Sequence, residues 1–140
     1  MRLREFALER DYPAVMALWQ TAGPGIHVSP SDSSDEISRK LQRDPDLFLV
    51  AEDGAQIVGT VIGGFDGRRG MVYHLAVAEG WRGRGVGSAL MAELEQRLKA
   101  RGCHKAYLMV ASENPEVKDF YQRLGWEVMD VFPMGKEFEP

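Results

Sequence analysis

The residues best suited to chemistry in this sequence form the segment 82–87, which reads RGRGVG. This segment stands between an apolar run, MVYHLAV, and a stretch with helical periodicity, GSALMAELEQRLKARG. A glycine-rich turn between a strand and a helix lets backbone N–H groups converge, and the helix N-terminus adds about half a positive charge there. Arg82 and Arg84 carry guanidinium groups that can reach phosphate oxygens. The pattern predicts a pyrophosphate site, and a tight connection with surface arginines is the alternative.

The two common nucleotide-binding motifs do not fit this turn. A Walker loop needs Lys-Ser or Lys-Thr after its second glycine, whereas Val86 and Gly87 follow Gly85. A dinucleotide fingerprint needs a third glycine where Ser88 stands, and Lys105 occupies the neighbourhood of its ribose-binding acid. An RNA-binding arginine-glycine tract is disfavoured because this tract is short and the chain is acidic. A different phosphate-bearing ligand is therefore expected.

A second group of candidate residues lies downstream, in the segment 114–126. Tyr121 carries a hydroxyl that could donate a proton, and its ordinary pKa near 10 keeps it protonated at neutral pH. It also shares a stripe at helical spacing with three apolar residues, which predicts a core position instead: Val117, Phe120 and Leu124. Asn114 precedes Pro115, where its side chain could cap a helix. Both residues thus have a structural and a functional interpretation.

Composition limits the classes of protein to which the chain can belong. The 140 residues are 44% hydrophobic and 27% charged, which predicts one globular domain over residues 1–140. Lys and Arg total 17 against 21 Asp and Glu, so a net charge of −4 disfavours nucleic-acid and anionic-membrane partners. No membrane span or signal peptide is seen, which favours a cytoplasmic protein. The single cysteine excludes an internal disulfide, and three scattered histidines predict no metal site.

The order of predicted elements places these residues in one mixed α/β or α+β domain. Helices are expected over 9–23, 34–43, 87–102 and 115–125, the second of them capped by Ser34. Strands are expected over 1–7, 47–52, 56–65, 70–77, 105–110 and 126–132. Asp-Gly pairs at 53–54 and 66–67 predict two hairpins, so the second, third and fourth strands are antiparallel neighbours. A mixed sheet with helices on both faces follows.

Together these residues resemble the GNAT superfamily of N-acetyltransferases. The segment 82–87 fits the (Gln/Arg)-x-x-Gly-x-(Gly/Ala) signature of that family, and Leu75-Ala76-Val77 precedes it as in the family. Asn114 and the segment FYQRLGW follow in the expected order. The resemblance covers nearly the whole chain. Within the superfamily, GTVIGGFDGRRG and LFLVAE are most similar to the small bacterial YpeA-type acetyltransferases.

The resemblance implies a fold and a cofactor. The fold is a twisted mixed sheet of about six or seven strands, with the fourth and fifth strands splayed apart. The turn is expected to hold the pyrophosphate of acetyl-CoA, and its pantetheine arm pairs with the fourth strand in the gap. The cofactor-binding residues that the resemblance implies are Leu75, Ala76, Val77, Arg82, Gly83, Arg84, Gly85, Val86, Gly87, Ser88 and Asn114.

The resemblance also implies the reaction. Such enzymes move an acetyl group to a primary amine by direct attack in a ternary complex, and no metal is needed. Tyr121 matches the general acid that protonates the departing thiolate. A backbone N–H near Leu75 or Ala76 would stabilise the oxyanion. Cys103 is interpreted as a packing residue and not as a nucleophile. A non-catalytic acyl-CoA-binding or regulatory module with the same fold is the alternative.

The general base and the substrate stay open. Relatives carry Glu or His on the fourth strand where Met71 and Tyr73 stand, and ribosomal-protein acetyltransferases carry Glu where Met109 stands. His74 faces away from the site by strand alternation unless a bulge intervenes, which leaves Glu113 or a water as further candidates.

The loop after the first helix offers two contacts for the amine, His27 and Asp32. The amine can belong to a small molecule, a protein N-terminus or a lysine. The resemblance also allows for a homodimer.

Overall fold

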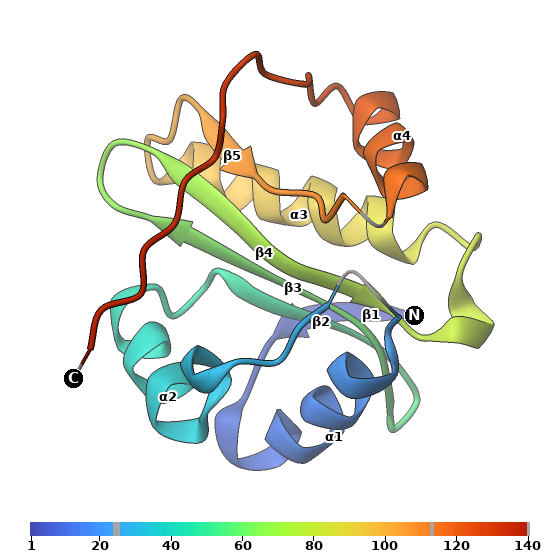
Figure 1. The fold of residues 1–140 in the computed structure, drawn as a ribbon. Helices are drawn as coiled ribbons and strands as arrows, with labels where there is room; N and C mark the ends of the chain where they lie inside the picture. Colours follow the sequence, from blue (N-terminus) through green and yellow to red (C-terminus); the bar gives the residue numbers. More distant parts are fainter. Residues whose placement is uncertain (24–25, 113, 140) are drawn as a thin grey trace.

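A computed structural model describes residues 1–23, 26–112 and 114–139 (Figure 1). The elements in chain order are β1 Arg2–Glu5, α1 Leu8–Thr21, the 3-10 turn η1 Pro30–Asp32, α2 Ser34–Arg43, β2 Phe48–Asp53, β3 Gln56–Phe65, β4 Gly70–Val77, the 3-10 turn η2 Glu79–Trp81, α3 Val86–Ala100, β5 Ala106–Leu108 and α4 Pro115–Arg123. None of the helices in these ranges combines the length and the hydropathy that crossing a membrane requires.

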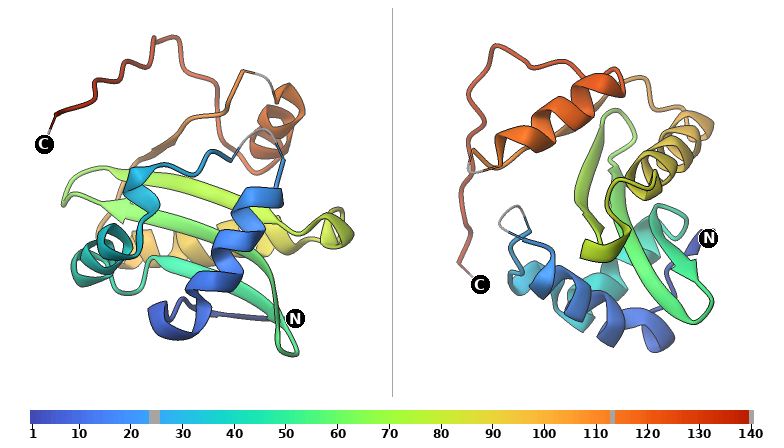
Figure 2. Two further views of the ribbon diagram at one scale, coloured as in Figure 1. Left: turned by 60° about the horizontal axis from the view of Figure 1, so that its bottom comes forward. Right: turned by 90° about the vertical axis from the view of Figure 1, so that its right-hand side faces the viewer.

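The predicted mixed sheet is confirmed, with helices on both of its faces. Its strand order is β1-β2-β3-β4-β5, and every neighbouring pair is antiparallel except β4 and β5, which are parallel. One apolar core joins α3 and α4 to the sheet, and a second joins α1 and α2 to the other face (Figures 1 and 2). Both predicted hairpins form, at β2–β3 and at β3–β4.

Close packing of α3 on the sheet explains two glycines of β3. A Cβ atom on Gly63 would lie 2.5 Å from Leu94 Cδ1, and one on Gly59 would lie 2.8 Å from Val86 Cγ1. Both distances are far below van der Waals contact, so only glycine lets the helix lie this near the strand. Leu94 and Val86 belong to the buried stripe of α3 that the sequence predicts. The helix that follows the turn is therefore held firmly in place.

The start of α2 differs by one residue from the prediction. Ser33, and not Ser34, is the N-cap, and its hydroxyl accepts a hydrogen bond from the Glu36 backbone N–H at 3.3 Å. Either serine satisfies the sequence preference for a cap, so the choice depends on which one adopts the extended backbone that a cap needs. Ser33 has φ −63° and ψ 157°, which meets that requirement.

The strand expected at 126–132 does not form, and the described sheet has five strands instead of six or seven. The segment 126–139 leaves α4 and extends to the C-terminal end without joining the sheet (Figure 2). Val131 is 62% exposed and Phe132 is 94% exposed. High β-propensity forms a strand only beside a partner, and β5 is three residues long. A cavity of about 940 Å³ lies between β5, α4 and this segment.

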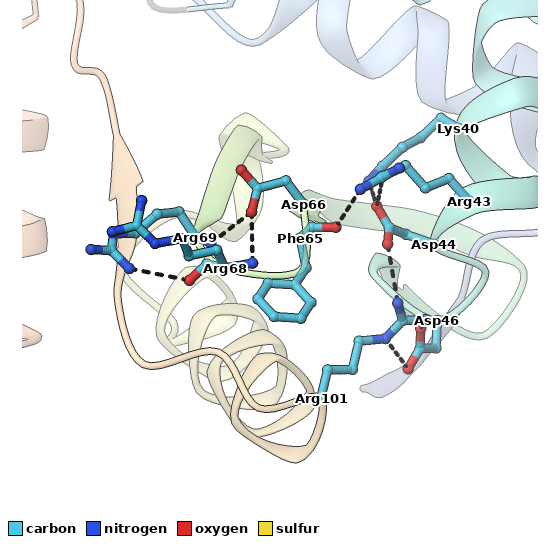
Figure 3. Close-up of polar contacts among 9 residues, drawn as sticks. All are labelled: Lys40, Arg43, Asp44, Asp46, Phe65, Asp66, Arg68, Arg69 and Arg101. Atoms are coloured by element: carbon cyan, nitrogen blue, oxygen red, sulfur yellow. Dashed lines mark hydrogen bonds and ion pairs between the residues drawn. The ribbon is translucent and has the colours of Figure 1, made fainter.

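A cluster of charges joins α2, β2 and α3 at their ends (Figure 3). The Asp44 side chain is 2% exposed and accepts hydrogen bonds from Lys40 Nζ at 2.6 Å and Arg101 Nη1 at 3.1 Å. Arg101 also pairs with Asp46, whose side chain is 36% exposed. A buried carboxylate is tolerated only when it is paired in this way. The cluster is therefore structural.

We expect Asp44→Asn to lower the free energy of unfolding by about 3 kcal/mol, because two cations lose a buried partner. Asp46→Asn is the matched control, since it removes the exposed partner of the same Arg101 and is expected to cost about 1 kcal/mol or less. Urea unfolding of both variants measures the difference. Equal losses would show that burial of Asp44 is not what makes the cluster stabilising.

Candidate active site

The predicted glycine turn leads directly into α3. Gly83 has φ +76° and Gly85 has φ +83°. Residues other than glycine rarely adopt this left-handed backbone conformation. Gly85 is the N-cap residue of α3 and contributes no side chain to its first backbone N–H groups. A Cβ atom on either glycine would meet no described atom within 4 Å. The turn therefore presents an open helix N-terminus, which suits an anion.

The other glycine of the signature has a different role. A Cβ atom on Gly87 would lie 3.2 Å from Phe120 Cζ, so this glycine allows α4 to pack against the first turn of α3. The neighbouring Ser88 is half-buried. Gly87 thus brings the turn and α4, the two segments that carry candidate site residues, close together.

The two arginines of the turn contact protein groups. Arg82 donates from Nη2 to the Ala22 carbonyl at 2.7 Å and from Nε to the Val77 carbonyl at 3.2 Å. The Arg84 guanidinium lies over the Trp81 ring, 4.9 Å from its centroid. Arg82 thus ties the turn to the end of α1. Phosphate contact by either arginine stays a prediction.

The splayed strands expected from the sequence are present. Hydrogen-bonded pairing of β4 with β5 covers only Gly70 to Val72 opposite Ala106 to Leu108. Beyond Val72, β4 remains paired with β3 up to Val77 but has no strand partner on its β5 side. The gap between the strands opens into a cleft of about 530 Å³. Of the predicted cofactor-binding residues, Leu75, Arg82 and Asn114 line this cleft. Backbone groups on this unpaired edge of β4 are available to a ligand.

A bulge in β4 turns His74 toward the cleft. Thr60 and Ile62 of β3 lie opposite Ala76 and Tyr73, so β4 accommodates two residues where β3 has one. At this bulge His74 has φ +47°, the only positive φ among the described non-glycine residues. At the bulge, His74 packs against Trp19 of α1 and Leu75 packs against the core beneath α3, and both residues line the cleft. The sequence prediction that His74 faces away holds only without a bulge, and the bulge is there.

Helix α4 forms the far wall of the cleft. Tyr121 is buried, packs edge-on against the rings of Phe120 and Trp126, and also lines the cleft. Burial raises the pKa of Tyr121 to about 12, so its hydroxyl stays protonated at neutral pH. Asn114 precedes the helix, but its side chain makes no capping hydrogen bond. Tyr121 thus fits both interpretations that the sequence left open, because it belongs to the core and also lines the cleft.

Other candidates are placed less favourably for chemistry. Met71 and Met109 line the cleft, but a thioether is no base. His27 is exposed in the loop after α1. Cys103 is buried, and its thiol donates to the Lys105 carbonyl at 3.4 Å, which fits the packing role expected for it. Glu113 lies outside the described residues.

Known proteins share both the sequence and the fold of this chain. A family model described as "Acetyltransferase (GNAT) family" matches residues 12–126. The chain belongs to the GNAT family. A curated GNAT-type relative, Acetyltransferase ECA0875 from Pectobacterium atrosepticum, is 44% identical over 136 residues, which are 97% of this chain and 94% of that protein.

Two solved structures have the same fold as this GNAT chain. Ard1 from Thermoplasma volcanium superposes with a TM-score of 0.79 at 25% identity, over 91% of this chain and 83% of Ard1. The PaiA N-acetyltransferase from Thermoplasma acidophilum, solved in complex with coenzyme A, superposes with a TM-score of 0.78 at 18% identity, over 94% and 92% of the two chains. This chain is thus a GNAT-type acetyltransferase.

The contact between two residues of the candidate site, Asp32 and His74, could not be predicted from the sequence. Asp32, expected as an amine contact, instead accepts a hydrogen bond from His74 Nε2, with its carboxylate oxygens 3.1 and 3.0 Å away. Forty-two positions separate them along the chain, so only the fold brings them together. Tyr73, which the sequence shows merely as a poor base, is 47% exposed in the cleft, and partial burial raises its pKa.

Proposed function

We propose that this chain transfers the acetyl group of acetyl-CoA to a primary amine by direct attack in a ternary complex. The observation that carries the proposal is the cleft between β4 and β5, which has the open N-terminus of α3 near one end and Tyr121 in its wall. GNAT family membership supports acetyl transfer in general. The nature of the amine and the roles of individual residues are our proposals.

The residues present fit acetyl-CoA. The turn offers backbone N–H groups at Val86, Gly87 and Ser88 for a pyrophosphate, because no side chain caps them. Arg84 lies exposed on the same turn and adds positive charge. Beyond Val72, the edge of β4 that faces away from β3 has no strand partner and can pair with the amide groups of a pantetheine arm. Asn114 lies on the opposite side of the same cleft.

Tyr121 is the proposed general acid. When the amine nitrogen attacks, its lone pair forms the new C–N bond, and the carbonyl oxygen gains a negative charge that a backbone N–H near Leu75 or Ala76 stabilises. As the C–S bond breaks, Tyr121 gives its proton to the sulfur and recovers one from the nitrogen. Its raised pKa does not prevent this step, since the same apolar surroundings also raise the pKa of a thiol.

The cleft favours an amine that arrives from the side of β4 opposite the glycine turn. Tyr73 offers an exposed aromatic ring there, and Ile26 and Met71 add apolar surface. Such walls suit a primary amine carried on a partly apolar group, as in a small molecule or at the end of a peptide. No choice between these two sources follows from the wall alone, and a panel of amines that includes both decides it.

Acetyl-CoA is expected to raise the melting temperature of the protein by several degrees, because a ligand that binds only the folded state stabilises it by mass action. Desulfo-CoA and free adenine nucleotides serve as comparison ligands in the same plate. Thiol release is then measured with small amines, amino acids, lysine peptides and N-terminal peptides. Thermal stabilisation by acetyl-CoA together with thiol release on one class of amine supports the proposal. Stabilisation without release on any class favours a non-catalytic acyl-CoA-binding module, and no stabilisation contradicts the assignment of the turn.

A further inference from the structure

We propose that His74 and Asp32 form the proton acceptor for the amine: His74 takes the proton and Asp32 orients its ring. This inference deepens the proposed function and rests on it. His74 is thereby assigned as a catalytic residue, and Asp32 as a positioning residue that acts through it. The assignment depends on four features of the described residues: the hydrogen bond between them, the burial of Asp32, the strained backbone of His74 and its position in the cleft.

The side-chain partner of the Asp32 carboxylate is His74. Asp32 is 4% exposed, and its Oδ2 atom also accepts a hydrogen bond from the Ser29 backbone N–H at 3.0 Å. Within the described part of the chain, no lysine or arginine forms an ion pair with it. A buried carboxylate needs a partner, and the partner here is an imidazole that can become positively charged. The Asp32 carboxylate is thus placed to orient the His74 ring.

The hydrogen bond also determines which ring nitrogen is free. A carboxylate only accepts, so Nε2 of His74 must carry a hydrogen whenever the bond to Asp32 is made. In the neutral ring this leaves the lone pair on Nδ1. Nδ1 is therefore the atom that can accept a proton from a substrate.

Several contacts hold His74 in its unusual conformation. The Thr60 hydroxyl donates to the His74 carbonyl at 3.2 Å and accepts from Trp19 Nε1 at 2.9 Å. The Trp19 ring also packs against the imidazole, with centroids 4.6 Å apart. Strained backbone outside glycine is kept where surrounding structure enforces it, most often at functional sites. Here the strained backbone turns the His74 side chain to the face of the sheet that carries Trp19 and Asp32.

His74 remains accessible from the cleft, since its side chain is 20% exposed. Within the described part of the chain, several groups that bear charge or titrate lie on the elements that border this cleft. They are Asp32 of η1, Tyr73 of β4, Arg82 of the glycine turn, and Glu116 and Tyr121 of α4. Of these, Asp32 is the one in hydrogen-bond contact with the ring.

The proton balance of the step is complete. An amine arrives as an ammonium group, one N–H bond breaks, and the proton moves to Nδ1 of His74, directly or through one water. The electron pair stays on nitrogen and becomes the nucleophile. The imidazolium is stabilised by Asp32 until its proton passes to solvent. Tyr121 then transfers the second proton, as described above. His74 and Tyr121 thus each serve in a separate proton transfer.

Two variants test the pair on the amine that gives the largest thiol release. At pH 7, His74→Gln is expected to lower kcat/KM for the amine about 100-fold, and Asp32→Asn about 10-fold, with the KM for acetyl-CoA changed less than about 3-fold. The loss in His74→Gln should shrink toward about 3-fold near pH 10, because the amine then arrives deprotonated from solution. His104→Gln, which replaces an exposed histidine outside the cleft, is the matched control and should leave the rate unchanged.

A loss that is the same at every pH would overturn the assignment, since a merely structural role predicts it, and so would full activity in His74→Gln. Nitrogen-15 NMR of the histidine rings provides a test that needs no substrate. It should report the Nε2–H tautomer for His74 in the unmodified chain and a mixture in Asp32→Asn. An Nδ1–H tautomer overturns the pair even in an inactive protein. Absence of transfer to every amine, with the Nε2–H tautomer present, counts against the proposed function instead.

Discussion

Gly85→Glu is expected to weaken acetyl-CoA binding about 1,000-fold, which corresponds to about 4 kcal/mol. The substitution acts in two ways. A carboxylate at the N-terminus of α3 repels the pyrophosphate and can itself cap the open backbone N–H groups that the ligand needs. The left-handed backbone at φ +83° also disfavours any side chain, so the turn is expected to change its shape. Isothermal titration with acetyl-CoA measures the loss.

Gly67→Glu is the matched control for this experiment. Gly67 has φ +99° and open space around it, as Gly85 does, but it lies in the β3–β4 hairpin at the opposite end of β4. Both variants should lose a similar, small amount of thermal stability from backbone strain. Only Gly85→Glu should lose the ligand. If acetyl-CoA binds both variants equally, the turn at 82–87 does not hold the pyrophosphate.

Tyr121→Phe is expected to lower kcat about 1,000-fold while acetyl-CoA affinity changes less than about 3-fold. The substitution removes one oxygen atom and keeps the ring, so the contacts with Phe120 and Trp126 are retained. Thiol release under saturating acetyl-CoA measures kcat, and titration of the same variant measures affinity. Thermal unfolding should differ little, because the apolar packing of α4 is unchanged.

Tyr107→Phe is the control for a general effect of removing a tyrosine hydroxyl. Tyr107 lies on β5, lines the cavity beside the C-terminal segment instead of the cleft, and has Lys105 near its ring. Its replacement should leave kcat unchanged. Because burial raises the pKa of Tyr121 to about 12, the rate should show no decline near pH 10, where an ordinary tyrosine would lose its proton. An unchanged kcat in Tyr121→Phe would make Tyr121 a core residue only.

Local patterns in the sequence predicted most of the elements. The Asp-Gly pairs specify two hairpins, and the apolar stripe from Val86 to Leu98 specifies α3, because these signals need only residues that are close in the chain. The strand at 126–132 was predicted by the same reasoning and is wrong. A strand is defined by its partner, and the segment has none in the described sheet. Local propensity could not reveal that.

The candidate site likewise contains features that the sequence predicts and features that it does not. The glycine turn, Asn114 and Tyr121 are recognisable in the sequence because each belongs to a short segment whose spacing is itself the signal. The bulge at His74 is not, since it depends on how β4 pairs with β3. Nor is the bond of Arg82 to the Ala22 carbonyl at the end of α1, because it joins segments that are 60 positions apart.

The sequence by itself determined that this chain is an acetyltransferase of the GNAT type, because the turn that carries the family signature is contiguous. Only the tertiary structure brings together the two residues that we propose as the proton acceptor. Asp32 comes from η1 and His74 from the bulged strand β4. Their side chains meet directly beside Trp19 of α1, and a contact between distant segments leaves no periodic pattern in either one. The proposed cofactor recognition is local in the sequence, and the proposed proton transfer depends on the fold.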